Sequence, residues 1–206
     1  VIDVLRQLAV PRVAPEKRSG AVVTAHRATN VDDPVRLGVL VELVHRLAGR
    51  VGSVTFPVHP RTRRRLEEHG LWAELAAEGI VLSDPVGYRT MSELVARSRV
   101  VVTDSGGLQE EASYFGVPVV VLRQSTPRWE GVAAGTSQLV GMDVERAMVA
   151  VDELTTPAAQ EAVAATPCPY GDGHTAERVA TLLAEEGTWE LLRLEEPDFI
   201  GRPPPA

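Results

Sequence analysis

The segment with the strongest chemical signal reads Val100-Val-Val-Thr-Asp-Ser-Gly-Gly-Leu-Gln-Glu-Glu111. An apolar strand ends in a polar turn, two glycines follow, and a helix begins at once. Free backbone N–H groups and the positive end of the helix dipole therefore face one point. Gly106 and Gly107 let an anion approach the backbone closely, and the Ser105 hydroxyl adds a donor. The pattern predicts a phosphate site, although the same glycines also suit a tight turn that serves packing alone.

Two adjacent carboxylates follow within the first turns of the same helix. Glu110 and Glu111 point about 100° apart around the helix axis. A carboxylate repels phosphate but accepts hydrogen bonds from the two hydroxyls of a ribose. One of this pair is therefore a candidate ligand for a sugar diol. The other acid of the segment, Asp104, has the simpler interpretation of a helix cap.

Two histidines are each expected directly after a strand. His26 follows Val22-Val-Thr-Ala25, and His59 follows Phe56-Pro-Val58. Ligands of open α/β sheets bind at the carboxyl ends of the strands. A histidine there can donate to a phosphate or transfer a proton, while a purely structural role stays open for both rings. The run Arg63-Arg-Arg65 after His59 is interpreted as the solvated face of a helix.

Two further polar segments carry candidate ligands. Arg128 lies in Leu122-Arg-Gln-Ser-Thr-Pro-Arg-Trp-Glu-Gly131, where its guanidinium can form a fork with phosphate oxygens or act as an ordinary surface charge. The turn Pro169-Tyr-Gly-Asp-Gly-His174 offers Asp172 and His174 as ligand contacts, but a helix-capping turn explains its composition better.

Short apolar runs alternate with longer amphipathic stretches, and this alternation predicts the elements that position these side chains. Continuous apolar runs are typical of parallel strands buried on both faces. We expect a doubly wound, Rossmann-like α/β domain with a parallel sheet. The expected strands are Ala21–Ala25, Val54–Val58, Ile80–Leu82, Val100–Thr103, Val117–Leu122 and Thr136–Val140.

Punctuating residues predict where the helices begin and end. The first main helix is expected from Asp33 and Pro34 to a stop at Gly49, and the second from a capping box that starts at Thr90. Others are expected from Gly107 to about Phe115, over Val144–Leu154 after a cap at Asp143, and over His174–Glu186. The domain organisation is then an N-terminal helix and linker over 1–20, a nucleotide-binding domain over 21–186, and a tail over 187–206.

Composition excludes several classes of function. The 206 residues carry 21 Lys and Arg against 28 Asp and Glu, a net charge of −7, which argues against non-specific nucleic-acid binding. No apolar run suits a membrane helix or a signal peptide, and the single Cys168 cannot form an intrachain disulfide. We find no metal-ligand spacing, Walker loop or Gly-x-Ser-x-Gly motif. A cytoplasmic setting is expected, and a chain that begins with Val1 is expected to be part of a longer product.

Together these segments resemble the C-terminal half of UDP-N-acetylglucosamine 2-epimerase of the non-hydrolysing, bacterial type. The resemblance extends over nearly the whole chain. It implies one half of a GT-B-type fold, with two Rossmann-like domains facing across a cleft, and interconversion of UDP-GlcNAc and UDP-ManNAc by elimination and re-addition of UDP. The motifs that carry it are Asp104-Ser-Gly-Gly-Leu-Gln-Glu-Glu-Ala112, Pro169-Tyr-Gly-Asp-Gly-His174, Ala25-His-Arg27 and Pro57-Val-His-Pro-Arg-Thr62.

The resemblance also implies roles for individual residues. His26 would contact the diphosphate and assist the departure of UDP as a catalytic residue, and Arg27 and His59 match positions of a second, regulatory UDP-GlcNAc site. Residues that would hold the substrate are His26, Ser105, Gly106, Gly107, Glu111 and Arg128. No cofactor and no metal are implied. The implied partners are the UDP-sugar, an N-terminal domain that carries the acidic catalytic residues, and a second copy in a homodimer.

Two alternatives stay open. A GT-B glycosyltransferase would use the same grip on UDP for transfer, although Gln109-Glu-Glu111 and Tyr170-Gly-Asp-Gly-His174 favour the epimerase. The second alternative is a non-catalytic module that binds UDP or a partner protein. Five residues differ from those usual in the family at positions of the base pocket or the regulatory site: Thr29, Val86, Met91, Pro127 and Trp129.

Overall fold

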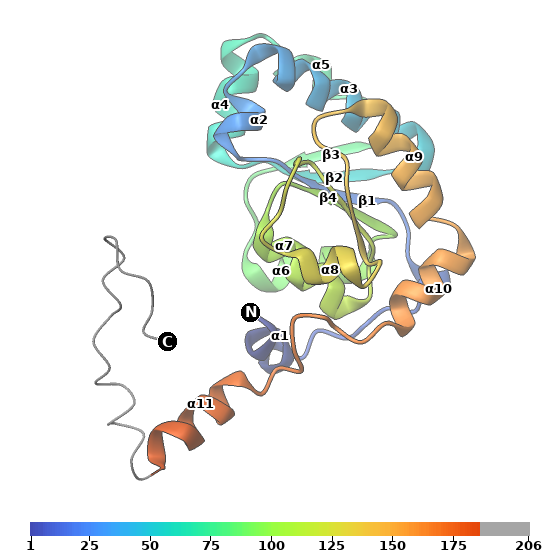
Figure 1. Ribbon diagram of the computed structural model, residues 1–206. Coiled ribbons are helices and arrows are strands. Elements are labelled where there is room, and N and C mark those ends of the chain that lie inside the picture. The colour runs from blue at the N-terminus through green and yellow to red at the C-terminus, as the bar shows by residue number, and fades with distance from the viewer. Residues whose placement is uncertain (186–206) are drawn as a thin grey trace, which may run out of the picture.

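The computed structural model describes residues 1–185 and contains a six-stranded, fully parallel sheet. Its strand order is β3-β2-β1-β4-β5-β6, so the chain winds outward from the centre in two directions (Figure 1). This order confirms the predicted doubly wound α/β fold. The strands are β1 (Ala21–Thr24), β2 (Val54–Pro57), β3 (Ile80–Ser83), β4 (Val100–Thr103), β5 (Val119–Val121) and β6 (Ser137–Leu139).

The central strands β1 and β4 are apolar up to the threonine that ends each of them, because both faces of the sheet are covered. Alternate residues of β1 enter different clusters: Val23 packs on one face with helix α3, and Val22 packs on the other with α6 and α7. The same alternation separates Val100 and Val102 from Val101 in β4. Parallel strands buried in this way leave only their ends free to carry polar groups. Functional side chains therefore gather at the carboxyl edge.

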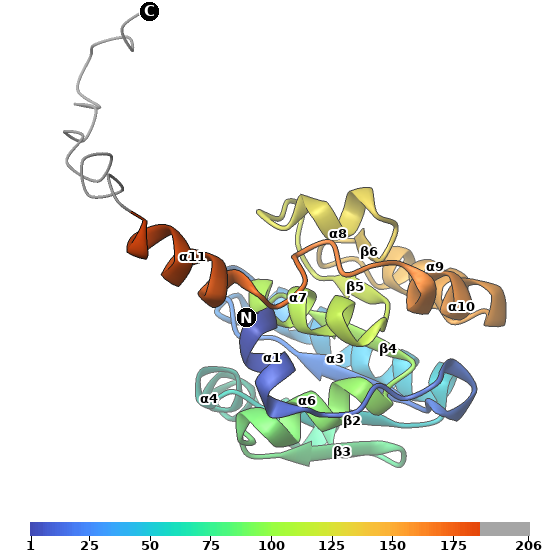
Figure 2. The ribbon, with the colours of Figure 1, turned by 90° about the horizontal axis from the view of Figure 1, so that it is seen from below.

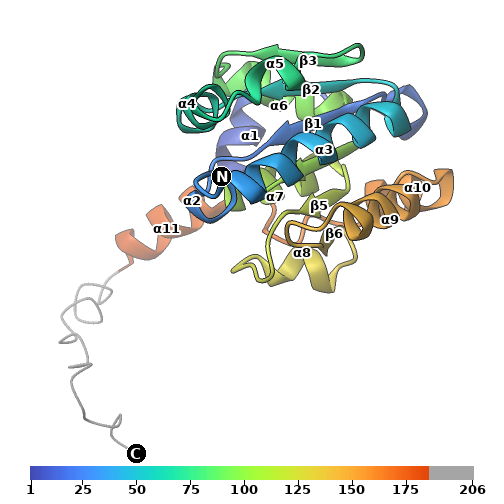
Figure 3. The same ribbon diagram turned by 90° about the horizontal axis from the view of Figure 1, so that it is seen from above.

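Helices cover both faces of the sheet. Figure 3 shows α3 and α9 over one face, and Figure 2 shows α1, α6 and α7 over the other. The described helices are α1 (Ile2–Leu8), α2 (Ala28–Val31), α3 (Pro34–Val51), α4 (Pro60–Glu68), α5 (Trp72–Leu75), α6 (Tyr88–Arg97), α7 (Gly106–Phe115), α8 (Trp129–Ala133), α9 (Val144–Leu154), α10 (Pro157–Ala165) and α11 (Thr175–Ala184), with a short 3-10 helix over Pro15–Lys17.

The segment between α1 and β1 is anchored to the core by a buried arginine. Arg18 donates through Nη1 to the Gly116 carbonyl at 2.6 Å and through Nη2 to the Phe115 carbonyl at 3.0 Å. Those carbonyls end α7, so a cation caps the negative end of that helix dipole. At the other end of the chain, α11 projects away from the sheet (Figures 1 and 2). None of the described helices is long and apolar enough to cross a membrane.

Most predicted elements are confirmed, but two helix boundaries were wrong. Helix α3 runs past Gly49 and ends at Gly52, whose φ of +85° is a left-handed conformation that favours glycine. Thr90 lies inside α6, which begins at Tyr88 after an N-cap at Gly87. The predicted tail over 187–206 and residue 186 of the last helix lie outside the described residues.

Candidate functional site

A pocket of about 230 Å³ opens at the carboxyl edge of the sheet. Segments that follow β1, β2, β3 and β4 all contribute to it, as expected where a doubly wound sheet changes direction. Its lining includes four of the predicted site residues from the strand ends and α7, together with His59. The lining residues are Thr24, His26, Pro57, His59, Pro85, Val86, Met91, Ser105, Gly107, Leu108 and Glu111.

The first turn of α7 forms the wall of the pocket that suits an anion. Ser105 is the N-cap of this helix, and its side chain accepts a hydrogen bond from the Leu108 N–H at 3.5 Å. The Thr103 hydroxyl accepts from the Ser105 N–H at 2.9 Å, which fixes the turn. The N–H groups of Gly106 and Gly107 begin the helix, where they have no acceptor within it. They point a positive dipole end at any ligand above the turn.

Asp104 does not cap α7, and this corrects the simplest interpretation of the sequence. Its side chain is fully buried and accepts from the backbone N–H groups of His26 at 3.1 Å and Arg27 at 2.9 Å, and from Asn30 Nδ2 at 3.1 Å. Burial opposes ionisation, but these hydrogen bonds and the His26 side chain outweigh it and lower the pKa of Asp104. An ionised Asp104 therefore ties the loop after β1 to the end of β4.

The same carboxylate orients the candidate catalytic histidine. His26 Nδ1 lies 3.1 Å from Asp104 Oδ1. Because an ionised carboxylate only accepts hydrogen bonds, the proton of a neutral imidazole belongs on Nδ1, and Nε2 is left for a ligand. The His59 ring lies beside it, with 5.5 Å between ring centroids. Two imidazoles thus share one side of the pocket.

Glu111 lines the pocket from α7, close to Gly107, and its pKa lies well above the usual range of a carboxyl group. Burial raises its pKa from 4.5 to about 7, the Tyr88 hydroxyl lowers it, and the charge of Glu110 raises it. Tyr88 responds in turn: burial and the Glu111 carboxylate raise the pKa of its hydroxyl to about 12. A buried carboxylate with one hydroxyl partner has lone pairs to spare, so it can accept hydrogen bonds from a diol.

Arg128 lies next to the anion turn but outside the pocket lining. Its Nε pairs with the Glu110 carboxylate, and its side chain lies 4.0 Å from where a Cβ on Gly106 would stand. The buried Gln109 holds this loop in place, because Thr126 Oγ1 donates to Gln109 Oε1 at 3.0 Å. The two adjacent glutamates therefore have different surroundings, one paired with arginine and one facing the pocket.

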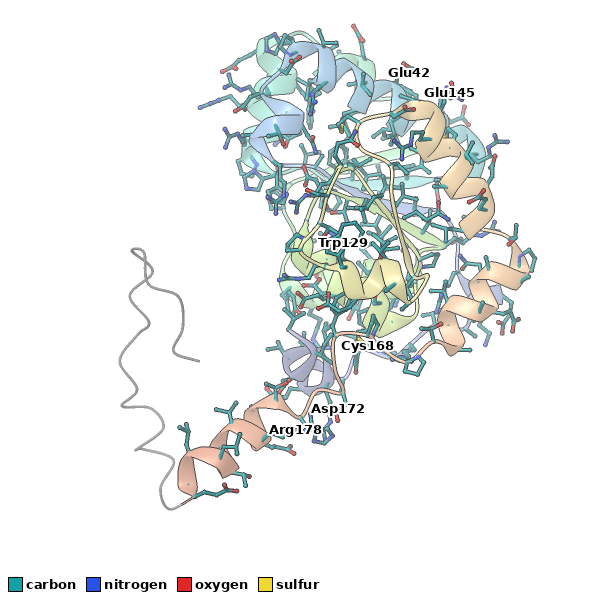
Figure 4. The ribbon with its side chains drawn as sticks, in the orientation of Figure 1. Glu42, Trp129, Glu145, Cys168, Asp172 and Arg178 are labelled. Carbon is teal, nitrogen blue, oxygen red and sulfur yellow. The ribbon has the colours of Figure 1, made fainter. Side chains whose placement is uncertain are left out.

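Other predicted candidates lie elsewhere. Arg27 is outside the pocket lining and donates through Nε to the Asp104 carbonyl at 2.8 Å. The turn before α11 does not cap that helix with its own side chains: Asp172 accepts from the His174 N–H at 3.2 Å and pairs with Arg178 (Figure 4). The Ala176 N–H of the helix donates instead to the Asp3 carboxylate of α1 at 2.7 Å. Trp129 is an exposed side chain at the start of α8 (Figure 4).

Sequence reasoning missed the roles of Asp104, Gln109 and Tyr88. The first two share the motif with Ser105, and only their complete burial shows that they organise the site. Tyr88 carries no motif, and its contact with Glu111 depends on how α6 packs against α7. No group of three or more His, Cys, Asp or Glu side chains within residues 1–185 is placed to hold a metal ion. The site joins anion donors, an oriented imidazole and a carboxylate suited to a diol.

Comparisons with known proteins give a consistent family assignment. The family model described as UDP-N-acetylglucosamine 2-epimerase matches residues 3–184. A Pseudomonas aeruginosa protein named UDP-2,3-diacetamido-2,3-dideoxy-D-glucuronate 2-epimerase is 40% identical over 168 residues, which are 80% of this chain and 44% of that protein. The chain thus spans a little under half the length of the curated relatives it matches.

Solved structures give the same result for the fold. The crystal structure of Methanocaldococcus jannaschii UDP-GlcNAc 2-epimerase in complex with UDP-GlcNAc and UDP has a TM-score of 0.74 at 34% identity, covering 81% of this chain and 45% of that one. The glycotransferase of kitacinnamycin has a TM-score of 0.58 at 19% identity, covering 84% and 44%. This second likeness concerns the fold alone.

Proposed function

The chain belongs to the UDP-N-acetylglucosamine 2-epimerase family, and on that premise we propose that residues 21–186 form the UDP-binding half of an enzyme that interconverts UDP-GlcNAc and UDP-ManNAc. One observation carries the proposal. The anion turn at Ser105, the oriented His26 and the buried Glu111 line a single pocket, although they are up to 85 residues apart in the chain. Their donors and acceptors match a diphosphate and a ribose in the order in which UDP presents them.

The proposed binding mode assigns one part of UDP to each wall. The diphosphate lies on the N–H groups of Gly106 and Gly107 and within reach of His26, with Arg128 on the nucleotide side. The ribose hydroxyls donate to the Glu111 carboxylate. The uracil then faces the less polar wall formed by Pro85, Val86 and Met91. This orientation pairs the diphosphate with hydrogen-bond donors and the ribose hydroxyls with an acceptor.

The proposed reaction inverts C2 of the sugar through an elimination. A base removes the proton from C2, the C2–H electron pair becomes the C1=C2 double bond of 2-acetamidoglucal, and the C1–O bond breaks so that UDP leaves. For this role His26 is the imidazolium: its Nδ1–H donates to Asp104, and its Nε2–H donates a hydrogen bond or a proton to the departing diphosphate. UDP then re-adds to C1 while C2 receives a proton on the other face. The groups that exchange the C2 proton belong, in this proposal, to an N-terminal domain.

The same proposal covers regulation and assembly. His59 lies beside His26, so a second UDP-GlcNAc bound at Arg27 and His59 would adjoin the first site. Activity needs the other domain across the cleft, and the expected assembly is a homodimer. A GT-B transferase would share this grip on UDP but would show transfer of the sugar to an acceptor rather than release of 2-acetamidoglucal.

Calorimetric titration with UDP, UMP and ADP tests the binding mode. We expect UDP to bind more tightly than UMP, which lacks the second phosphate, and more tightly than ADP, which carries the wrong base. Glu111→Ala removes a charged acceptor and should weaken UDP binding by about 1–3 kcal/mol. Glu42→Ala, on the outer surface of α3 (Figure 4), is the matched control. Equal affinity for all three nucleotides, or no effect of Glu111→Ala, contradicts the proposal.

A further inference from the structure

Tyr170 belongs to a motif that the proposed binding mode leaves without a role. The motif Pro169-Tyr-Gly-Asp-Gly-His174 lies between α10 and α11, and this segment of the chain passes beside α8 (Figure 2). The ring of Tyr170 packs against the apolar cluster to which β4, β5, α6 and α7 contribute. The ring is therefore anchored in the domain, and its hydroxyl reaches α8.

The Tyr170 hydroxyl makes two hydrogen bonds to the start of α8. It accepts from the Gly131 N–H at 3.0 Å and donates to the Arg128 carbonyl at 3.2 Å. Burial raises the pKa of this phenol, so the hydroxyl keeps the proton that it donates. Gly131 leaves room for the hydroxyl, because a Cβ at this residue would lie 2.4 Å from the hydroxyl oxygen. Two segments that are distant in the chain thus fit closely together.

These two hydrogen bonds take the place of a helix cap. Arg128 is the N-cap residue of α8, and its side chain makes no capping hydrogen bond. Ser, Thr, Asp and Asn are preferred at this position because their side-chain oxygen accepts from an N–H of the first turn. A guanidinium carries donors only and cannot accept. Because the Tyr170 hydroxyl accepts from this turn instead, an arginine can occupy the N-cap of α8.

The backbone of Arg128 is also held at its N–H group. This N–H donates to Thr126 Oγ1 at 3.1 Å, and the Thr126 hydroxyl donates to Gln109 Oε1 at 3.0 Å. Gln109 Nε2 in turn donates to the Ser105 carbonyl at 3.0 Å. Ser105 is the N-cap of α7 in the anion turn. One chain of hydrogen bonds therefore connects Arg128 to the anion turn, and a second connects it to Tyr170.

The fixed backbone places the Arg128 side chain beside the anion turn. Its Nε pairs with the Glu110 carboxylate, and its Cγ and Nε lie 4.0 Å from where a Cβ on Gly106 would stand. The side chain is 38% exposed, so its remaining N–H donors are open to a ligand. Ordering a long side chain on binding costs conformational entropy, and a backbone that is already held lowers this cost. The guanidinium is therefore prepared to form a fork with phosphate oxygens.

We infer that Tyr170 is a positioning residue for Arg128: its hydroxyl holds the N-cap of α8 so that the guanidinium stands beside Gly106 and binds the diphosphate. The inference rests on the proposed function and adds to it a residue outside the pocket lining. Tyr170 does not itself contact the nucleotide and acts only through Arg128. Without the hydroxyl, the ring keeps its packing, but the start of α8 loses its cap and Arg128 must be ordered when UDP binds.

Tyr170→Phe tests the inference because it removes the hydroxyl and keeps the ring. Calorimetry on the purified protein should show UDP binding about three- to tenfold more weakly to this variant than to the native protein. Tyr114→Phe is the matched control. Tyr114 packs against the same apolar cluster, with its ring edge-on to Phe115 and 5.2 Å from the Arg12 guanidinium. This control should bind UDP as tightly as the native protein does.

A double-mutant cycle with Arg128→Ala separates positioning from a general effect on the structure. Tyr170→Phe should weaken UDP binding in the native background and have no further effect in the Arg128→Ala background. Urea unfolding establishes that each variant is folded under the conditions of the titration. If Tyr170→Phe does not fold, Thr126→Val replaces it, because it removes the hydroxyl that accepts from the Arg128 N–H. The same cycle should then show a loss of affinity only where Arg128 is present.

Three outcomes overturn the role of Tyr170 and leave the proposed function standing. The first is native affinity for UDP in folded Tyr170→Phe. The second is an equal loss of affinity in both backgrounds, which would mean that Tyr170 supports the site without acting through Arg128. The third is an unchanged affinity in Arg128→Ala. If the native protein does not bind UDP, the proposed function itself is wrong, and the role of Tyr170 falls with it.

Discussion

The raised pKa of Glu111 predicts that nucleotide-sugar affinity increases with pH. The carboxylate accepts two ribose hydroxyls only when ionised, and its pKa is about 7 because burial outweighs the Tyr88 hydrogen bond. Glu111 is then ionised, and able to bind the ribose, in about one molecule in eleven at pH 6 and in about nine in ten at pH 8. The apparent affinity should therefore rise about tenfold from pH 6 to pH 8, or about 1.4 kcal/mol.

Calorimetry with UDP-GlcNAc across this range is the assay. UDP-GlcNAc is preferred to UDP because a terminal phosphate titrates near pH 6 and would add its own pH dependence. Binding near pH 7 should also release protons, which changes the measured heat between buffers of different ionisation enthalpy. Glu111→Gln cannot ionise, so its affinity should be low and lose this increase. An affinity that stays constant or falls as the pH rises in the native protein refutes the reasoning.

The same shift has a consequence for stability without ligand. A carboxyl whose pKa is raised on folding contributes stability below its unfolded value of 4.5, and this contribution is lost as the pH rises through about 7. At pH 8 the buried charge of Glu111 then costs about 3 kcal/mol. Glu111→Gln should raise the unfolding midpoint in urea at pH 8 and leave it nearly unchanged at pH 4. A stabilisation that is equal at both values would show that burial of the charge is not the cause.

Three further predictions concern the framework of the site. Asp104→Asn replaces an acceptor of three N–H groups by an amide and should cost about 2–4 kcal/mol in urea unfolding; it should also weaken UDP binding, because His26 loses its orienting partner. Arg18→Ala leaves two buried carbonyls at the end of α7 unpaired and should lower the unfolding free energy by about 2–4 kcal/mol. Gly116→Ala places a Cβ at a residue with a φ of +68°, only 2.9 Å from the backbone of α10, and should destabilise the protein by more than about 1 kcal/mol in thermal melts. Gly38→Ala is the control: its Cβ would lie in open space within α3, and it should stabilise the protein by about 0.5–1 kcal/mol.

The strands were predictable because parallel strands buried on both faces leave continuous apolar runs, and each such run begins and ends at polar or glycine residues. All six expected strands are present, with ends shifted by at most two residues. Helix ends were less predictable, because glycine, the residue that most often ends a helix, also occurs inside helices. Gly49 and Gly52 are both possible stop signals for this helix in the sequence. Only the structure shows that Gly52, with its left-handed φ, is the residue at which α3 ends.

The predicted site residues fall into two groups. His26, Ser105, Gly107 and Glu111 meet in one pocket because each follows a strand or opens α7, and strand order alone brings those ends together. Arg128 lies beside this group, paired with Glu110. Spacing could not separate Glu110 from Glu111, since both orientations around a helix are equally compatible with the local sequence.

The amino-acid sequence by itself determined the fold class, the strand ends and the types of group available for a phosphate and a diol, because these follow from local patterns of apolar and polar residues. Only the tertiary structure decided how those groups behave. Burial of Asp104 beside three N–H groups keeps it charged, whereas burial of Glu111 beside a single hydroxyl raises its pKa to about 7. Solvation and hydrogen bonding depend on neighbours that are distant in the chain, so the same side-chain type acquires opposite properties within one motif.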